Sequence, residues 1–164
     1  MAIVTFADVP ETRLDFQNLD RVGKLPILAA SGSTDLGGGV NTALDRLEAR
    51  KSEYKQAGID YFQPWLVLMT DGQPTTQNHV VASRRALDME DQAKLVIMPI
   101  GIGSFADMHV LSTFSNRRKP LRLRGLNFKE LFVWLSKSIV RVSHSRPGEM
   151  VQLDMEGIKG WAEI

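Results

Sequence analysis

Apolar and polar positions along this chain follow two alternating patterns that together predict an α/β fold. Short apolar runs, typical of buried strands, are followed by longer segments in which apolar residues recur every three or four positions, as on one face of a helix. We expect strands at residues 2–7, 25–30, 65–70 and 94–100, a weakly helical connection at 10–23, and an edge strand at 120–124. We expect helices at residues 38–57, 78–91 and 107–114, and a final helix from Asn127. This alternation is typical of a doubly wound, mostly parallel sheet with helices on both faces.

The final helix and the tail behind it differ in character. Apolar residues on one face of the helix predict that it packs against the sheet, and these are Phe128, Leu131, Phe132, Leu135, Ile139 and Val142. After Ser143 the sequence Ser-His-Ser-Arg-Pro-Gly ends the helix, and the residues beyond it lack helical periodicity. We therefore predict a domain at residues 1–143 and a C-terminal extension at 144–164 that packs on the domain or binds a partner. Trp161 in this extension fits either role equally well.

A strand that ends in an acid marks the first candidate site. The apolar run that ends at Met69 and Thr70 is followed directly by Asp71 and Gly72. In α/β sheets, ligands bind outside the carboxyl ends of the strands, so Asp71 stands where a site is expected. Thr70 could add a hydroxyl to this site, but alternation along the strand favours an inward, hydrogen-bonded core group.

A glycine-rich loop at residues 31–39, running into the helix at 38–57, supplies further oxygen atoms through Ser33 and Thr34. We expect the Thr34 hydroxyl and the Asp71 carboxylate to meet at one edge of a parallel sheet. Oxygen ligands without thiol or imidazole suit Mg²⁺ or Mn²⁺ and do not suit zinc. Asp35 could be a further ligand, but an aspartate at this position is more often a helix cap.

Several short motifs give the chain a resemblance to a known family. The loop Gly-Ser-Thr-Asp-Leu-Gly-Gly-Gly, the strand end Leu-Met-Thr-Asp-Gly-Gln-Pro-Thr and the later Ile-Gly-Ile-Gly resemble those of a von Willebrand factor A (VWA) domain. More narrowly, the chain is similar to the bacterial TerY-like subgroup, which is associated with tellurium resistance and stress response. Its Val-Thr-Phe strand and its late Phe-Val-Trp-Leu-Ser helix match that subgroup in the expected order.

The resemblance implies a metal-ion-dependent adhesion site (MIDAS), which the family builds from three loops around one divalent cation. Thr34 and Asp71 occupy two of its metal-binding positions, and the resemblance implies a partner-binding edge at Ser33, Thr34, Asp71 and Gly72. The third loop of the family, Asp-x-Ser-x-Ser, is not found in this sequence. We therefore expect an incomplete site that binds Mg²⁺ weakly.

The same departure from the family predicts a gap in the sheet, because the strand before the third loop is central in that fold. Two strand edges are then expected to be free, and free edges recruit other strands. Either a neighbouring segment, such as the C-terminal extension, fills the gap, or the isolated chain forms a homodimer or aggregates through the exposed edges.

Composition and charge narrow the classes of function. With 164 residues, 43% of them hydrophobic, the chain can bury one core. It has no cysteine, which excludes disulfides and thiolate metal sites. The N-terminal residues lack a secretion-signal pattern and no stretch is apolar enough to span a bilayer, so we expect a cytoplasmic protein without a membrane partner.

The net charge of +1 gives no general attraction to nucleic acid, although basic residues gather in one stretch. These are Arg117, Arg118, Lys119, Arg122 and Arg124. The explanation that we favour is that the arginines protect the edge strand at 120–124 from pairing with other strands. The alternative is that this stretch docks an acidic protein partner. Binding of nucleic acid is the least favoured explanation, because no aromatic residues lie between the basic ones to stack on bases.

These observations favour a noncatalytic protein-binding module over an enzyme. None of the histidines has a serine or cysteine partner at a spacing that suggests a catalytic triad. The resemblance implies partners that are kinase- or phosphatase-like proteins of a bacterial stress response. The alternative from another class is a small Mg²⁺-dependent hydrolase or phosphotransferase that uses Asp71 and Thr34.

Overall fold

A computed structural model of the protein describes residues 1–29, 31–143 and 156–163. The chain forms two compact units. The first unit combines Met1–Asp60 with Pro74–Ala86, and the second combines Tyr61–Gln73 with Leu87–Ile164. The fold is α/β, as predicted, and its larger sheet has four strands that are mostly parallel.

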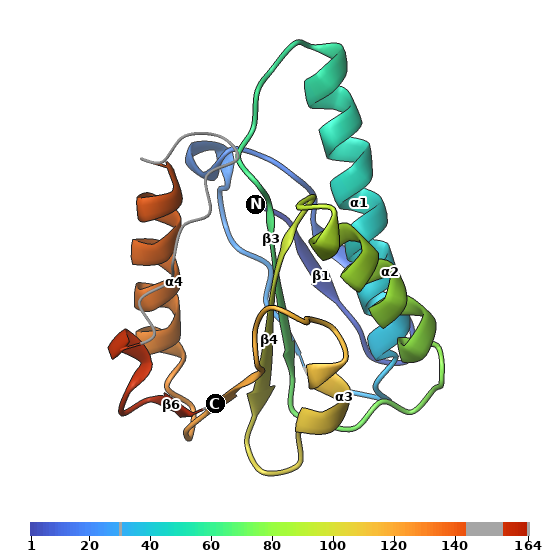
Figure 1. The fold of residues 1–164 in the computed structure, drawn as a ribbon, viewed down its shortest axis with the longest axis vertical. Coiled ribbons are helices and arrows are strands. Elements are labelled where there is room, and N and C mark those ends of the chain that lie inside the picture. The colour runs from blue at the N-terminus through green and yellow to red at the C-terminus, as the bar shows by residue number, and fades with distance from the viewer. Residues whose placement is uncertain (30, 144–155, 164) are drawn as a thin grey trace. The chain divides into compact units, whose positions relative to one another are not determined.

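The first unit is built around one long helix and a small sheet. Strands β1 (Ile3–Thr5) and β2 (Glu11–Leu14) form a two-stranded antiparallel sheet, and η1 (Leu19–Arg21) follows them. Helix α1 (Leu36–Gln56) lies against both strands (Figure 1). A Cβ atom on Gly39 would stand 2.5 Å from the Phe6 ring, so glycine at this position lets α1 approach the end of β1 closely.

The prediction of a weakly helical connection at 10–23 is partly wrong, since only η1 in this range is helical, and the strand predicted at 25–30 is wrong for the residues described. The connection at 10–23 contains strand β2, whose side chains alternate between exposed and half-buried positions, a period-two pattern that favours a strand over a helix. Residues 25–29 of the strand predicted at 25–30 form no strand, and Ala30 lies outside the described residues. Ile27 in this segment is 79% exposed, and Pro26 has no backbone N–H to give to a strand neighbour.

The second unit holds the larger sheet, with strand order β3-β4-β5-β6. Strands β3 (Trp65–Thr70), β4 (Val96–Ile102) and β5 (Leu121–Leu123) are parallel, and β6 (Ala162–Glu163) is antiparallel to β5. Within the described part of this sheet, β3 pairs with β4 alone. The described residues also form the α-helices α2 (His79–Asp91), which begins in the first unit, α3 (Met108–Ser112) and α4 (Phe128–Ser143).

Two glycines lie at the carboxyl end of β4, Gly101 inside the strand and Gly103 directly after it. Gly103 has a φ of +72°, a conformation that favours glycine. A Cβ atom on Gly101 would stand 2.5 Å from Met108 Sδ, so this glycine lets α3 pack closely on the end of β4.

The core of the second unit lies between α4 and one face of the sheet (Figure 1). Leu131, Trp134 and Leu135 of α4 pack with Met98 and Ile100 of β4. The predicted helix face is partly wrong, because Phe132 and Ile139 are more than half exposed. Both lie about 100° of helix rotation from the centre of the buried stripe, to which Trp134 belongs. The side chain of Val142 lies outside the described part of the chain.

The C-terminal segment adds a strand to the sheet. β6 and the short helix η2 (Glu156–Ile158) belong to this segment, and Ile158, Trp161 and Ala162 join the core. The prediction of an edge strand at 120–124 is wrong, since β5 pairs with β4 on one side and with β6 on the other. Residues 144–155 of the predicted extension lie outside the described residues. No helix in the described ranges is long and apolar enough to cross a membrane.

Candidate functional site

The hydroxyl loop that precedes α1 is fixed by a second loop of the first unit. The Thr34 N–H donates a hydrogen bond to Thr75 Oγ1 at 3.3 Å, and the Thr75 N–H donates to the Thr34 carbonyl at 3.0 Å. The side-chain hydroxyl of Thr34 forms no hydrogen bond within the described residues. The loop therefore holds the main chain of Thr34 in place and leaves its hydroxyl available.

Asp35 is the N-cap of α1, the role that the sequence favoured over that of a metal ligand. Its Oδ1 accepts hydrogen bonds from the Gly38 N–H at 3.0 Å and from Asn78 Nδ2 at 2.6 Å. Thr76 Oγ1 donates to the amide oxygen of Asn78 at 2.5 Å. The carboxylate is thus committed to holding the loop at residues 74–78 against the start of α1.

Replacing Asp35 by alanine is expected to lower the free energy of unfolding by about 1–2 kcal/mol, because the cap of α1 is lost. Loss of the Asn78 contact acts in the same direction. Urea denaturation followed by circular dichroism measures the change. The matched control is Asp60→Ala, which removes an exposed carboxylate of the same unit. Equal stability of the two variants would contradict the capping role.

Asp8 is a site residue that the sequence interpretation missed. The Ser33 N–H donates a hydrogen bond to Asp8 Oδ1 at 2.8 Å. Hydrogen bonds from Ser33, first from its side chain and then from its backbone, lower the pKa of the Asp8 carboxyl. A Cβ atom on Gly32, whose φ is +79°, would stand 2.5 Å from this carboxylate. Its place just after the strand predicted at residues 2–7 was a weak signal in the sequence, but its contact with Ser33 depends on the tertiary fold.

Asp71 and Gly72 belong to the second unit, where they follow β3 directly. Thr70 is 6% exposed, and its hydroxyl oxygen accepts a hydrogen bond from the Gly72 N–H at 3.4 Å, so its interpretation as a core group is confirmed. Asp71 is exposed. Ser33 and Thr34 belong to the first unit, and their convergence with Asp71 stays a prediction. Among the residues that the structure describes, no three His, Cys, Asp or Glu side chains gather in a group that could hold a metal ion.

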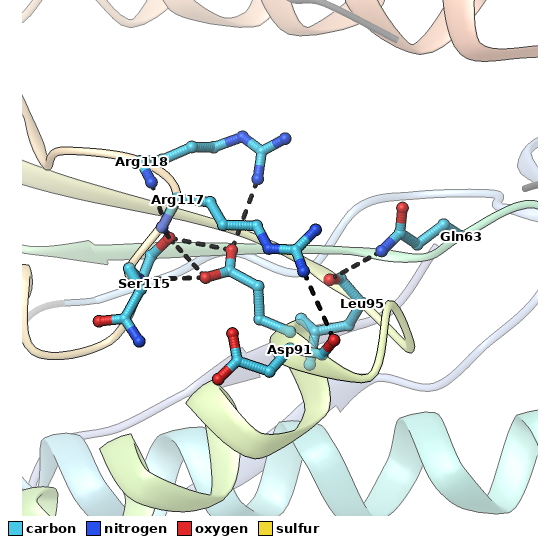
Figure 2. A network of polar contacts seen from close by, with 8 residues as sticks. Gln63, Asp91, Leu95, Ser115, Arg117 and Arg118 are labelled. Atoms are coloured by element: carbon cyan, nitrogen blue, oxygen red, sulfur yellow. Dashed lines mark hydrogen bonds and ion pairs between the residues drawn. The ribbon is translucent and has the colours of Figure 1, made fainter. Parts of the chain in front are cut away.

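The second unit contains a buried carboxylate that the sequence interpretation also missed. Glu90, 1% exposed, accepts hydrogen bonds from Ser115 Oγ at 2.9 and 2.8 Å and from the Asn116 N–H at 3.2 Å. Arg118 Nη1 lies 3.5 Å from the same carboxylate. Figure 2 shows Ser115, Arg117 and Arg118 of this network, which we call the Glu90 network.

The Glu90 network orders the turn at residues 115–118. The N–H groups of Arg117 and Arg118 donate to Ser115 Oγ at 3.2 and 3.0 Å, and Arg117 Nη2 donates to the Asp91 carbonyl at 3.4 Å (Figure 2). Burial is the main cause that lowers the pKa of Arg118; the charge of Arg117 lowers it further, and Glu90 acts against both. These contacts indicate that the role of the Glu90 network is structural, namely to fix the turn at residues 115–118.

Comparison with known proteins shows that the fold of this chain is similar to that of a solved structure. No protein-family model matches the chain, and no curated protein matches it significantly. Its structure is similar to the solved structure of proximal thread matrix protein 1 from the mussel byssus, with a TM-score of 0.52 and 20% sequence identity. The match covers 86% of this chain and 34% of that one, so this chain spans about a third of the solved chain.

Proposed function

We propose that the protein is a noncatalytic protein-binding module of the VWA type. Its partner-binding residues are Ser33 and Thr34 of the first unit and Asp71 and Gly72 of the second. The observation that carries this proposal is the loop at residues 31–35. Asp8, Thr75 and Asn78 hold its main chain and its cap, while the Thr34 hydroxyl has no partner within the described residues. A loop ordered before binding loses less conformational entropy when a partner binds.

The arrangement of strands supports the proposal. β1 and β2 form one sheet, and β3 to β6 form another. Two separate sheets are expected when the strand that the VWA fold places at the centre is not part of the sheet. The C-terminal strand β6 pairs with β5 and leaves the edge of β3 without a strand in the described part of the chain. We therefore keep the proposal that β3 pairs with a strand from elsewhere, a second copy of the chain included.

The proposal implies Mg²⁺ as the cation, and the two candidate ligands carry the kind of oxygen atom that this ion prefers. Thr34 and Asp71 would hold the ion through a hydroxyl and a carboxylate, which are hard oxygen ligands. When bound, the ion would offer an open coordination position to a carboxylate of the partner. Two protein ligands bind Mg²⁺ weakly, so we expect the partner to contribute to its affinity.

The wider setting of the proposal comes from the TerY-like resemblance. It suggests a cytoplasmic protein in a bacterial tellurium-resistance or stress-response system, with kinase- or phosphatase-like partners. The chain has no cysteine, which is consistent with a reducing compartment.

Two measurements test the proposal. In a pull-down from a lysate of the source organism, we expect a partner that wild-type protein retains and that Thr34→Val and Asp71→Ala lose. Asp60→Ala, which removes an exposed carboxylate elsewhere, should retain it. Retention of the same partner by all variants would refute the binding edge. Separately, calorimetry with Mg²⁺ and Mn²⁺ should show weak binding to the isolated chain, and micromolar affinity would show that the metal site is complete.

A further inference from the structure

The structure divides the basic stretch at residues 117–124 into two parts with different surroundings. Arg117 and Arg118 belong to the turn that the Glu90 network orders (Figure 2). Arg122 and Arg124 lie on and directly after β5. Because β5 is paired on both sides, protection of a free edge no longer explains these two arginines.

Arg122 and Arg124 line an open cavity of about 460 Å³ in the second unit. It lies at the carboxyl ends of β4 and β5, where ligands of parallel sheets bind. Its remaining lining residues are Gly103, Ser104, Leu123, Gly125 and Glu163.

The charge that lines the cavity is net positive, with two guanidinium groups and one carboxylate. Arg122 Nη1 donates to the Gly103 carbonyl at 2.5 Å, which fixes the side chain and leaves further N–H groups for a ligand. Arg124 Nη2 lies 3.3 Å from Glu163, and both side chains of this pair are about half exposed. Exposed ion pairs are weak, so an incoming carboxylate can replace Glu163.

Two apolar side chains flank the cavity in sequence. Phe105 follows Ser104 and is 83% exposed, and Leu126 follows Gly125 and is 75% exposed. They are the two most exposed large hydrophobic residues described in the second unit. Exposed apolar side chains next to a basic cavity in sequence fit a partner that carries both apolar and acidic residues.

We propose that this cavity binds an acidic peptide segment of a protein partner. A glutamate or aspartate carboxylate pairs with Arg122 and displaces Glu163 from Arg124, and neighbouring apolar residues of the peptide contact Phe105 and Leu126. The apolar flanks favour a peptide over a free phosphate ion. The chain's net charge of +1 gives little long-range attraction to a nucleic acid. This site shares no residue with the proposed binding edge at Thr34 and Asp71.

Fluorescence anisotropy with a labelled peptide of alternating glutamate and leucine tests the proposal. Wild-type protein should bind it, and should bind the matched glutamine and leucine peptide at least about tenfold more weakly. Arg122→Gln and Arg124→Gln should each weaken binding by about tenfold. Lys119→Gln, which removes a neighbouring exposed charge outside the cavity, should leave it unchanged.

Glu163→Gln gives the most specific result, because it removes the competing carboxylate and should tighten binding. Phe105→Ser should weaken binding without a change in charge, and Asp71→Ala should have no effect, which separates this site from the proposed function. The proposal is overturned if the two arginine variants bind like wild type, or if Lys119→Gln weakens binding as much as they do. It is overturned also if inorganic phosphate or a single-stranded oligonucleotide binds Arg122 and Arg124 more tightly than the peptide does.

Discussion

Replacing Trp161 by alanine is expected to lower the free energy of unfolding of the protein by about 3–5 kcal/mol. Trp161 is 8% exposed, and its ring centroid lies 5.9 Å from that of Trp134. Its indole N–H donates to the Gly157 carbonyl at 2.8 Å, and its own carbonyl accepts from the Arg124 N–H at 2.9 Å. Because domains of this size are stable by about 5–15 kcal/mol, the loss is a large part of the total.

Guanidinium denaturation followed by far-ultraviolet circular dichroism measures this loss without relying on tryptophan fluorescence. Phe132→Ala is the control, since it also removes a large aromatic side chain, but one that is 55% exposed on α4. It should cost much less than Trp161→Ala, about 1 kcal/mol or less. Equal losses for the two variants would show that Trp161 does not anchor the C-terminal segment. The sequence left anchoring and partner binding equally open, and the burial of Trp161 favours anchoring.

The elements that the sequence predicted well are those whose signal is local. β3 has the predicted bounds of residues 65–70, because its apolar run is followed at once by Asp71 and Gly72. α1 and α2 begin and end within two residues of their predicted bounds, since their periodicity is long and Asp35 caps the first of them. Hydrophobic periodicity and caps act within a few residues, and one sequence is enough to find them.

The elements that the sequence did not predict are strands whose formation depends on pairing with another strand. β6 has two residues, and it exists because Ala162 pairs with Leu123 about forty positions earlier. β2 also depends on a partner, although a nearer one, since Glu11 pairs with Thr5 of β1. Residues 25–29 show the opposite case, in which an apolar run finds no strand partner among the described residues. Strand formation requires a neighbour, and a single segment does not specify one.

The candidate site likewise contains residues whose roles the local sequence predicted and residues whose roles depend on the tertiary fold. The roles of Asp35 as a cap and Thr70 as a core group follow from their positions in a helix and a strand. Asp8, Thr75 and Asn78 were missed because they reach the loop at 31–35 through the tertiary fold, from distant parts of the sequence. Glu90 was missed for another reason. On a helix with many charged residues, nothing local distinguishes one buried acid from its exposed neighbours.

Replacing Glu90 by leucine is expected to destabilise the protein by about 3–5 kcal/mol, which is the cost of breaking a buried ion pair from one side. The substitution leaves Ser115 Oγ and the Asn116 N–H without their acceptor, and it leaves Arg118 partly buried without a counter-charge. Glu90→Gln should cost less, because the amide oxygen still accepts from Ser115. Urea denaturation of each variant measures the losses, with Asp91→Leu, an exposed acid on the same helix, as the control.

The double variant Glu90→Leu with Arg118→Met separates the two parts of this loss. If the unpaired charge is the larger part, the double variant should be more stable than Glu90→Leu alone, because removal of the guanidinium also removes its desolvation cost. If the lost hydrogen bonds to Ser115 and Asn116 dominate, Arg118→Met should bring no recovery. A cost below about 1 kcal/mol for Glu90→Leu would contradict both accounts, since a carboxylate with three bonded groups would then contribute no more than an exposed side chain. The first outcome is expected, because burial lowers the pKa of Arg118 and so disfavours its charge, and the loss of Glu90 removes the charge that opposes this shift.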